Sequence, residues 1–543
     1  MGIKDMYTQP ARKPDTNAVN EAGGVAYENS PEWQLTKLVT TGMLSNTYYV
    51  DAKTVNDKTF ELAKKVSPEF LAKLIVYARN QGYMRSNPIQ LLVLLSVRNP
   101  YLFRKVFRKV VHTGKDLIDF VTVVLSGSIR KELGSAPRKE VREMLNKMDA
   151  YQYVKYGSNQ QNPSIKDIIK IAHPEAPDNE RNELYKYMLG KEHNVKSLPV
   201  KVQEYLEFVA SEAGSPNRIE LLNTGHLPHE VVTATKLTAK EWTALAQNMP
   251  YMATLRNLNT MARQGVFEDK EALRSVTAYI ANEEAVTKSK QFPYRFMSAY
   301  LNLAEGMPQS VKTALGKAME VACRNIPSVD GLVVVGADTS GSMSYGHVGG
   351  SNGRQSKIRF IDVAALISSA ILKKNPDALI LPFDTQIHKS NLNADDTILT
   401  NAQKLAKYGG GGTCCSLPFE HVLHDAKVLK EMKLFIGITD SESWVRTGYN
   451  YGSNRSTDTM AAWKEIRRKN PQAEAILINV APYTSDQVKE GTPGLTMVSG
   501  FSDEVFRLIG MQVSGGVGSQ LDAIKATSLE GKATAPEVTV VSD

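Results

Sequence analysis

Apolar residues recur at helical spacing from about residue 30 to 325. Examples are PEFLAKLIVYARN, PIQLLVLLSVRN and KDLIDFVTVVLSGSIRKEL, which are separated by short links rich in Pro, Gly and Asn. Successive helices of about 12 to 18 residues with short connections predict antiparallel helix pairs. These pairs could form a bundle or an α-solenoid of the HEAT type, and no clean repeat period separates a degenerate solenoid from an irregular helical domain.

The pattern changes after about residue 328. Four apolar runs, GLVVVGAD, ALILPFD, KLFIGITD and AEAILINVA, indicate buried strands, and helical stretches such as SKIRFIDVAALISSAILKKN lie between them. This alternation predicts a parallel, doubly wound sheet with its functional loops at the carboxyl ends of the strands. Three of the runs end in aspartate, at Asp338, Asp384 and Asp440.

The two patterns predict an α + α/β chain with four segments. We expect a flexible N-terminus over 1–20, a helical-repeat domain over 21–327, a Rossmann-like domain over 328–512 and a tail over 513–543. The segment MVSGFSDEVFRLIG indicates a last strand and helix, and the polar sequence after it predicts a loose tail.

Composition adds constraints on the compartment and the partners. The chain has 543 residues, a hydrophobic fraction of 42% and a charged fraction of 22%, which predict a soluble protein of two or three domains. Its net charge of +8 favours polyanionic partners such as nucleic acid. The three cysteines have no zinc-site spacing and favour a reducing compartment. Without an apolar signal segment or a run of about 18 apolar residues, we expect a cytoplasmic protein that does not contact a membrane.

The stretch ADTSGSMS, at the end of the first predicted strand, carries candidate chemistry. It lacks the leading glycine of a nucleophile elbow, and the nearby YGGGGTCCSLP lacks the lysine of a phosphate-binding loop. The remaining pattern, D-x-S-x-S, presents Asp338, Ser340 and Ser342 in one turn as hard oxygen ligands for Mg²⁺ or Mn²⁺. Thr413 and Asp440 stand at loops that the sheet would bring nearby.

These five residues resemble the metal-ion-dependent adhesion site (MIDAS) of von Willebrand factor A domains. The resemblance implies that Ser340, Ser342 and often Thr413 bind the cation directly, while Asp338 and Asp440 can act through water. An open coordination position would take a partner's carboxylate or another oxygen donor. Asp384 is expected to line the loop. The alternative is a vestigial site whose polar groups only bond one another.

The helical region resembles the TROVE module of Ro ribonucleoproteins. The resemblance rests on AGGVAYENSPEWQLTKLVTTGMLSNTYYV, MPYMATLRNL and QFPYRFMSAY, and in the metal-site segments on GGTCCSLP and ITDSESW. Cys414 is a departure, because the family often has aspartate there. The resemblance implies a ring of HEAT-like repeats closed by the A domain. Such a ring binds small structured Y RNAs on its outer face and threads single-stranded ends of misfolded RNAs through its hole.

Basic and aromatic side chains alternate between about residues 130 and 173, as recognition of single strands and loops requires. The resemblance places RNA contacts at Lys155, Lys166, Lys170 and His173, with Arg138 and Lys139 as a further basic pair. The full candidate set is Arg130, Lys131, Arg138, Lys139, Lys155, Tyr156, Lys166, Lys170 and His173. The alternative is an ordinary solvated helix face, which the interspersed glutamates favour. For Arg256 and Asn257 a structural role is favoured.

The interpretation is a monomeric, non-enzymatic RNA-binding protein of the Ro type that carries one divalent cation. Y-like RNA would act as tether or gate, and defective RNA ends would pass to degradation machinery such as an exoribonuclease. The residues offer no constellation of acid, base and nucleophile. The rival hypothesis is a protein-binding scaffold whose A domain grips a partner's acidic side chain through the metal. A third, an accessory protein of a remodelling ATPase, gives no account of the helical region.

Overall fold

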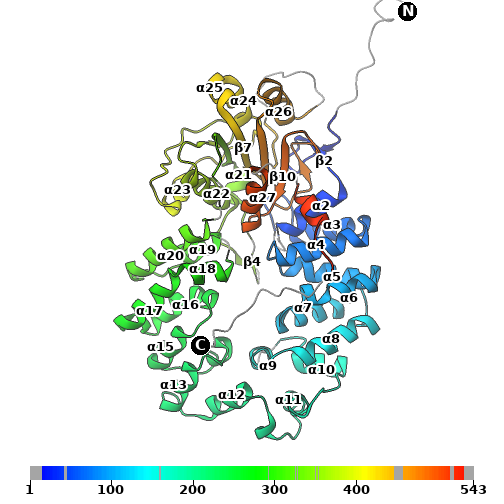
Figure 1. Ribbon diagram of the computed structural model, residues 1–543, viewed down its shortest axis with the longest axis vertical. Helices are drawn as coiled ribbons and strands as arrows, with labels where there is room; N and C mark the ends of the chain where they lie inside the picture. Colours follow the sequence, from blue (N-terminus) through cyan, green and yellow to red (C-terminus); the bar gives the residue numbers. More distant parts are fainter. Residues whose placement is uncertain are drawn as a thin grey trace, which may run out of the picture. The chain divides into compact units, whose positions relative to one another are not determined.

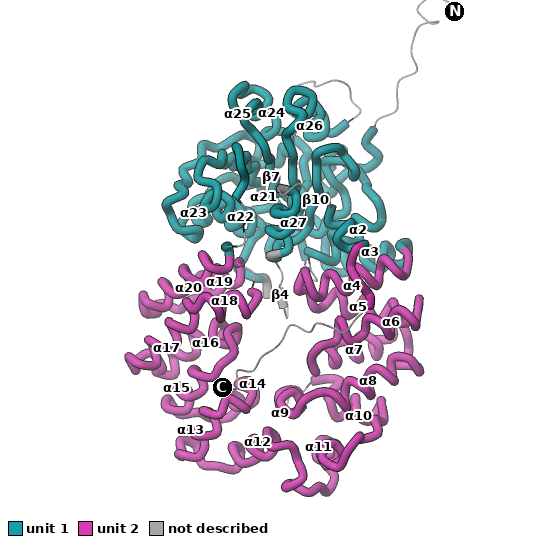
Figure 2. The backbone as a smooth tube through the Cα atoms, in the orientation of Figure 1, with its two compact units in different colours: residues 1–66, 323–525 teal, residues 67–322, 526–543 magenta. Residues whose placement is uncertain are grey.

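The computed structural model describes residues 15–41, 46–157, 161–291, 293–324, 326, 328–348, 350–351, 354–445, 456–513 and 519–530. The chain divides into two compact units (Figure 2). Unit 1 comprises residues 1–66 and 323–525, and unit 2 comprises residues 67–322 and 526–543. Within the described ranges, no helix is both long and apolar enough to cross a membrane.

Unit 1 is built on a five-stranded sheet with the strand order β10-β8-β7-β3-β6 (Figure 1). The strands are β3 (Leu332–Asp338), β6 (Leu379–Phe383), β7 (Met432–Thr439), β8 (Glu474–Asn479) and β10 (Leu495–Ser499). Every neighbouring pair is parallel. The four apolar runs and the last strand that the sequence indicated are therefore confirmed, as is the α + α/β fold class.

Helices follow the strands in the alternating order that a parallel sheet requires. They are α21 (Gly341–Tyr345), α22 (Phe360–Lys374), α23 (Ile398–Leu405), α24 (Leu417–His424), α25 (Ala426–Glu431), α26 (Asp458–Lys469), α27 (Asp503–Val513) and α28 (Gln520–Lys525), with a short β4 (Gly350–Ser351) and β5 (Arg354–Gln355) hairpin. Helices α24 and α26 pack Phe419 and Trp463 against Val334 and Phe435 of the sheet. The Phe419 and Phe435 rings stack with their centroids 4.0 Å apart. This packing fixes the central strands whose carboxyl ends carry the candidate chemistry.

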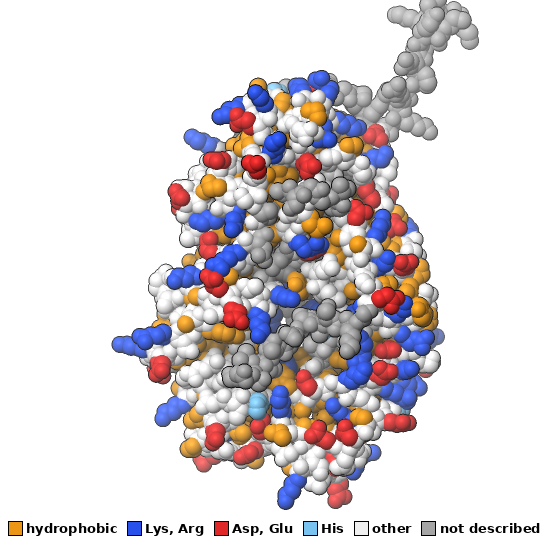
Figure 3. Space-filling view, in the orientation of Figure 1, with side chains coloured by type: hydrophobic (Ala, Val, Ile, Leu, Met, Phe, Trp, Pro, Cys, Tyr) orange, Lys and Arg blue, Asp and Glu red, His pale blue; other side chains and the backbone are white. Residues whose placement is uncertain are grey.

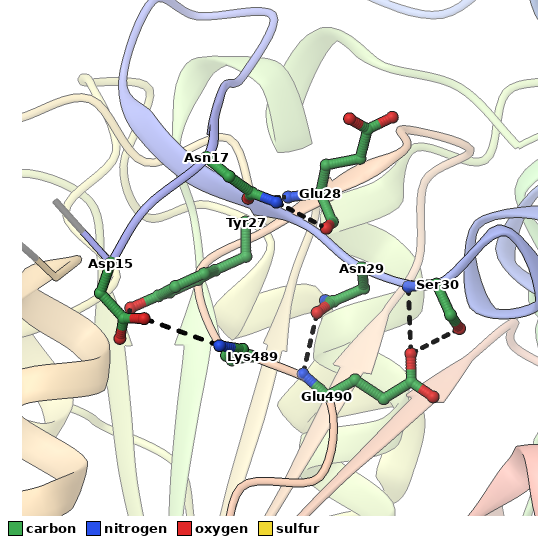
Figure 4. A pocket seen from close by; sticks show the side chains of 8 residues that line it. All are labelled: Asp15, Asn17, Tyr27, Glu28, Asn29, Ser30, Lys489 and Glu490. Atoms are coloured by element: carbon green, nitrogen blue, oxygen red, sulfur yellow. Dashed lines mark hydrogen bonds and ion pairs between the residues drawn. The ribbon is translucent and has the colours of Figure 1, made fainter. Parts of the chain in front are cut away.

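The N-terminal segment belongs to unit 1, whereas the sequence placed residues 21–327 together in one helical domain. Its elements are β1 (Ala18–Val19), β2 (Val25–Glu28), α2 (Pro31–Thr40) and α3 (Ala52–Lys65). Strand β2 pairs antiparallel with β9 (Ser485–Asp486) of the α/β region. Figure 4 shows the same junction, where the Ser30 hydroxyl donates to Glu490 at 2.6 Å and the Glu490 amide donates to Asn29 at 2.8 Å. These are contacts between residues some 460 positions apart, which helical periodicity cannot reveal.

Unit 2 is a succession of helices, each packed on near neighbours along the chain, as in a solenoid of helical repeats (Figure 1). They are α4 (Pro68–Asn80), α5 (Ser86–Arg98), α6 (Pro100–Val110), α7 (Gly114–Leu125), α8 (Ser135–Lys147), α9 (Ala150–Gly157), α10 (Ile165–Ala172), α11 (Asn179–Leu189), α12 (Val200–Ala210), α13 (Pro216–Asn223), α14 (His229–Val232), α15 (Ala239–Gln247), α16 (Tyr251–Arg263), α17 (Lys270–Ile280), α18 (Glu283–Ser289), α19 (Pro293–Leu301) and α20 (Gln309–Ala322), with short 3-10 turns at Val195–Ser197 and Val266–Glu268. Many begin with a side-chain cap; in α10, Ser164 and Asp167 form a capping box. In the first half of unit 2, the buried rings of Phe103, Phe107 and Phe120 contact one another.

The two ends of the chain lie partly outside the described residues. Of the N-terminus expected to be flexible, residues 1–14 are outside them, and so are 514–518 and 531–543 of the predicted tail. Between these stretches the tail forms α28, in which the Gln520 amide bonds both backbone groups of Ser499 at 2.8 and 3.0 Å. Glu530 then contacts α6 of unit 2, where its carboxylate lies 2.6 Å from the Lys105 ammonium.

Candidate functional site

The D-x-S-x-S turn lies where β3 ends and α21 begins. Asp338 is the last residue of β3, and its Oδ1 accepts the backbone amide of Ser340 at 2.9 Å. Ser340 stands at the N-cap position of α21, and its hydroxyl lies 3.3 Å from that of Ser342. The three side chains are buried. The turn thus gathers two hydroxyls and a carboxylate in a small volume.

The glycine-rich loop 409–413 brings Thr413 to the same edge of the sheet. Its backbone is bonded to the turn, because the Gly410 amide donates to Thr339 and the Gly341 amide donates to Gly411, each at 2.8 Å. Gly409 has a φ of +77°, and a Cβ there would lie 2.0 Å from the Thr339 carbonyl oxygen, so only glycine allows this approach. The Thr413 carbonyl accepts the Trp444 amide at 3.1 Å and so joins the loop to the chain after β7.

Asp440 completes the group from the strand next to β3. It follows the end of β7, and the Ser342 side chain lies close enough to its carboxylate to lower the carboxyl pKa against the larger, opposite effect of burial. Strands β3 and β7 are paired in parallel, so their carboxyl ends meet at one edge. The structure therefore brings Asp338, Ser340, Ser342 and Asp440 together, with the Thr413 loop bonded to their backbone.

The electrostatics of this group suit a cation. Asp338 and Asp440 are both fully buried. Burial raises the pKa of Asp338 to about 7, with the charge of Asp440 as the next contribution, and burial also raises the pKa of Asp440. Asp440 Oδ2 is buried without a hydrogen-bond partner in the described part of the chain. Two adjacent buried carboxylates with an unsatisfied oxygen are unfavourable unless a positive charge compensates them, and the residues present fit a hard divalent cation.

The donor set also limits which metals fit. The described residues hold no cluster of three or more His, Cys, Asp or Glu side chains that could bind a metal ion. Two carboxylates with hydroxyls favour Mg²⁺ or Mn²⁺ over softer metals. Asp384 lies on the neighbouring loop, where its carboxylate is 3.1 Å from His388 Nε2 and its carbonyl accepts the Cys414 amide at 3.0 Å. Its described contacts match the loop-lining role expected from the sequence.

The candidate RNA contacts separate into two groups in unit 2. One group lies on exposed positions around α10. Lys166 and Lys170, four residues apart, are exposed, while Ile165 and Ile168 of the same helix are buried. His173 ends this helix in a left-handed conformation with φ 53° and is also exposed. Lys166, Lys170 and His173 form what we call the α10 surface.

Helix α8 and the turn before it contribute further members. Lys131 and Lys139 are exposed, and Arg138 is half-buried in the first turn of α8. Arg130 has a structural role, because its guanidinium donates to the Ser96 hydroxyl and to the Glu132 carbonyl, each at 2.7 Å. Arg130 is the candidate whose described hydrogen bonds fit an RNA contact least.

The second group surrounds Lys155. Its ammonium lies 2.8 Å from the Glu230 carboxylate and 5.9 and 5.6 Å from the ring centroids of Tyr151 and Tyr156. Lys201 of α12 lies 5.7 Å from the Tyr151 ring. Tyr156 is half-buried, and this burial raises the pKa of its hydroxyl to about 12, so the hydroxyl stays neutral.

Three arginines that the sequence did not single out as RNA contacts are electrostatically connected to the Lys155 group. Burial lowers the pKa of the Arg256 guanidinium, and the charges of Arg295 and Arg85 lower it further. All three residues are exposed, although the surroundings of the Arg256 guanidinium partly desolvate it. The nearby charge of Glu230 acts on both Arg256 and Tyr156, which ties the arginines to the Lys155 group. We call Arg85, Lys155, Arg256 and Arg295, with the rings of Tyr151 and Tyr156, the cationic cluster.

Sequence reasoning missed most of this cluster for a simple reason. Its members come from α9, α16 and α19 and from the residue just before α5, and no local spacing connects them. The motif that holds Arg256 was the available signal, yet a structural role was favoured for it. That role fits Asn257, whose amide donates to the Ala253 carbonyl at 2.9 Å, rather than the exposed Arg256.

Comparisons with known proteins follow the same two-part division. The TROVE domain family matches residues 32–225 and 188–326, and the Ro60 vWA domain matches residues 332–511. The RNA-binding protein RO60 of Deinococcus radiodurans is 26% identical over 472 residues, which cover 80% of this chain and 86% of that protein. Telomerase protein component 1 of Mus musculus is 24% identical over 294 residues, 43% of this chain and 11% of that protein.

A solved structure supports the fold independently. The crystal structure of the Deinococcus radiodurans RO (RSR) protein matches with a TM-score of 0.62 at 20% identity, covering 90% of this chain and all of that one. The two family matches together span both patterns seen in the sequence, and the TROVE match alone spans more than half of the chain. The chain therefore belongs to the TROVE-domain family of Ro proteins that carry a C-terminal Ro60-type von Willebrand factor A domain.

Proposed function

We propose that this protein binds RNA through unit 2 and takes part in noncoding RNA quality control. The observation that carries the proposal is the cationic cluster, in which Lys155 pairs with Glu230 beside the rings of Tyr151 and Tyr156. The charges of Glu230, Arg85 and Arg295 all act on Arg256. Basic groups that track a phosphate backbone, together with rings that stack on bases, are the requirements of single-strand recognition. A relative aligned over 86% of its length is named an RNA-binding protein.

The two groups of residues suit two kinds of RNA. The α10 surface presents exposed basic side chains, which suit the phosphates of a structured, Y-like RNA. The cationic cluster joins charge to half-buried rings, which suits unpaired ends of misfolded RNA. Lysine and arginine side chains elsewhere are interspersed with acidic ones over the visible face (Figure 3). Net charge alone therefore does not select the binding surface, and the proposal rests on these two groups. The same proposal includes the delivery of bound RNA to an exoribonuclease, with the Y-like RNA as tether. This part of the proposal rests on the family resemblance.

An electrophoretic mobility shift with a small structured RNA tests the proposal. We expect salt-sensitive binding by the wild type, and about tenfold weaker binding when Lys166 and Lys170 are both changed to alanine. The salt slope should fall by about 2, because two phosphate contacts are lost. The matched control changes Lys236 and Lys240, which are exposed, four residues apart and in the same unit, to alanine. Equal loss in both variants, or no binding by the wild type, would contradict the proposal.

We propose further that the edge of the unit 1 sheet holds one divalent cation, Mg²⁺ or Mn²⁺. The ligand set is Asp338, Ser340, Ser342, Thr413 and Asp440. When bound, the cation offers an open position to an oxygen donor. The ligand residues of the chain would neutralise the charge of the cation, orient it and keep it buried. The support for the site is the unsatisfied Asp440 Oδ2 and the mutual proximity of the two buried aspartates.

Thermal unfolding tests the cation site. At a concentration of Mg²⁺ about 100 times its dissociation constant, binding should stabilise the wild type by about 2.7 kcal/mol and raise the midpoint of the unit 1 transition by about 5 to 10 °C. Asp440→Asn should abolish this increase, because it weakens the one ligand whose oxygen has no other partner. Asp384→Asn, at the next strand end, is the matched control and should keep most of the increase. A wild type that Mg²⁺ does not stabilise would refute the site.

A metal-dependent scaffold remains as the second function, because aromatic side chains are exposed beside this site. Tyr345, at the end of α21, is 68% exposed, and Trp444, bonded to the Thr413 carbonyl, is 52% exposed. Exposed rings beside a cation are typical of a surface that docks a partner through an acidic side chain. EDTA would release such a partner and ribonuclease would not, whereas an RNA-tethered partner would respond the opposite way.

A further inference from the structure

A short segment of the N-terminal region lies against the proposed cation site within unit 1. Residues 46–50 form a tight turn, in which the Thr47 amide donates to the Val50 carbonyl at 2.8 Å and the Val50 amide donates to the Thr47 hydroxyl at 3.0 Å. We call residues 46–50 the strap. The turn bonds make the strap a defined structure that can position its own side chains.

Two aromatic contacts hold the strap on the α/β region. The Tyr49 and Tyr483 rings meet edge to face with centroids 5.8 Å apart, and the Tyr49 amide lies 3.4 Å from the Tyr483 hydroxyl. The ring of Tyr48 stacks at 6.4 Å on that of Tyr345, three residues beyond Ser342. Since Tyr483 is buried and Tyr345 belongs to α21, the helix that carries Ser342, the strap is held at two points of the α/β region, one of them on this helix.

The Tyr49 side chain reaches the ligands themselves. Its hydroxyl lies close enough to Ser342 to interact with that side chain, and Ser342 in turn lies close to the Asp440 carboxylate. Burial raises the pKa of Tyr49 to about 12, and the charges of Asp440 and Glu442 add to this effect, so the hydroxyl remains a neutral donor. A neutral hydroxyl beside a serine ligand can orient that serine or hold a water of the cation's shell.

We propose that Tyr49 is a positioning residue of the cation site, and that closure of the strap and binding of the cation favour one another. The inference rests on the proposed cation site. As a consequence, the strap lies over the cation ligands. A carboxylate from another protein must bind beside the strap or displace it. Because linkage is reciprocal, the factor by which the cation stabilises the strap equals the factor by which the strap strengthens cation binding.

Hydrogen exchange of the full-length protein, with and without Mg²⁺, tests the coupling, alongside calorimetric titration of Mg²⁺. In the wild type, Mg²⁺ should slow amide exchange in residues 46–50 about fivefold to tenfold, the size of one hydrogen bond. Tyr49→Phe, which keeps the ring contact with Tyr483 and loses the hydroxyl, should remove this protection and weaken Mg²⁺ binding by the same factor. Tyr48→Phe is the matched control, and both quantities should stay at their wild-type values in it.

The outcomes separate this inference from the proposals on which it depends. If Mg²⁺ binds the wild type while strap exchange is unchanged, or if Tyr49→Phe matches the wild type in both measurements, the coupling is refuted and the cation site stands. If titration shows no Mg²⁺ binding, the site and the coupling fall together. RNA binding, measured by mobility shift, is independent of either result.

Discussion

Changing Lys37 to methionine is expected to destabilise unit 1 by about 3 to 5 kcal/mol, because it leaves a buried carboxylate without its countercharge. Lys37 is fully buried in α2, and its ammonium lies 2.9 Å from Asp486 Oδ1. The same nitrogen donates to the Ser485 carbonyl at 2.8 Å. Thermal or urea unfolding of the full-length protein should show the unit 1 transition about 10 °C lower.

The partner carboxylate explains why the loss should be large. Asp486 Oδ2 already accepts the Trp33 indole at 2.9 Å and the Asn29 amide at 3.0 Å, so the aspartate cannot turn toward water. Lys53→Met is the matched control, since Lys53 pairs with Asp57 on the surface at 2.8 Å with 86% of its side chain exposed, and we expect little change from it. Removing both charges, as Lys37→Met with Asp486→Leu, should recover much of the loss. An effect no larger than that of Lys53→Met would mean that the N-terminal segment does not depend on this pair.

This pair also marks the limit of what the sequence could predict about the fold. The strands were predictable because a strand buried on both faces is a continuous apolar run, as in β7. Helix α2 shows an ordinary helical pattern, and nothing in that pattern states which part of the chain covers it. Its burial depends on β9 and the loop after it, about 450 residues away. The periodicity of a helix predicts which of its faces is buried, but it does not predict which part of the chain packs against that face.

The candidate site divides in the same way. Asp338 and Asp440 could be placed together from sequence, because both follow apolar strands and parallel strands share one carboxyl edge. Tyr49 could not, since it reaches the edge from the N-terminal segment. Lys155 was grouped with Lys166 and Lys170 through the family resemblance of one sequence segment, and the structure shows that it pairs with Glu230, whereas the two α10 lysines are exposed. Side chains close in sequence can lie on different surfaces when a turn separates their helices.

The separation of Lys155 from the α10 surface gives the RNA proposal its sharpest consequence. If the cationic cluster binds unpaired RNA, changing Arg85, Arg256 and Arg295 together to alanine should weaken binding of a single-stranded oligoribonucleotide by about 1000-fold or more. Each lost contact to a phosphate is a hydrogen bond to a charged group, worth about 1.5 to 3 kcal/mol. Fluorescence anisotropy over a range of salt concentrations measures the loss, and the salt slope should fall by about 2, because single strands release about 0.7 counterion per phosphate contact.

The fold should tolerate this change, because the three arginines are exposed and Asp116, the buried carboxylate that Arg85 approaches at 3.8 Å, keeps its closer ion pair with Arg79 at 2.9 Å. Circular dichroism and an unchanged thermal midpoint would establish that the triple variant is folded. The variant with Lys166 and Lys170 changed to alanine supplies the reciprocal control. It should bind the single strand nearly as the wild type does and lose affinity for the structured RNA. If instead both variants weaken both RNAs equally, the two groups form one surface and the assignment of separate RNA classes is wrong. If the triple variant binds the single strand like the wild type, the cluster is not the site, and the charge around Glu230 serves the packing of unit 2 alone.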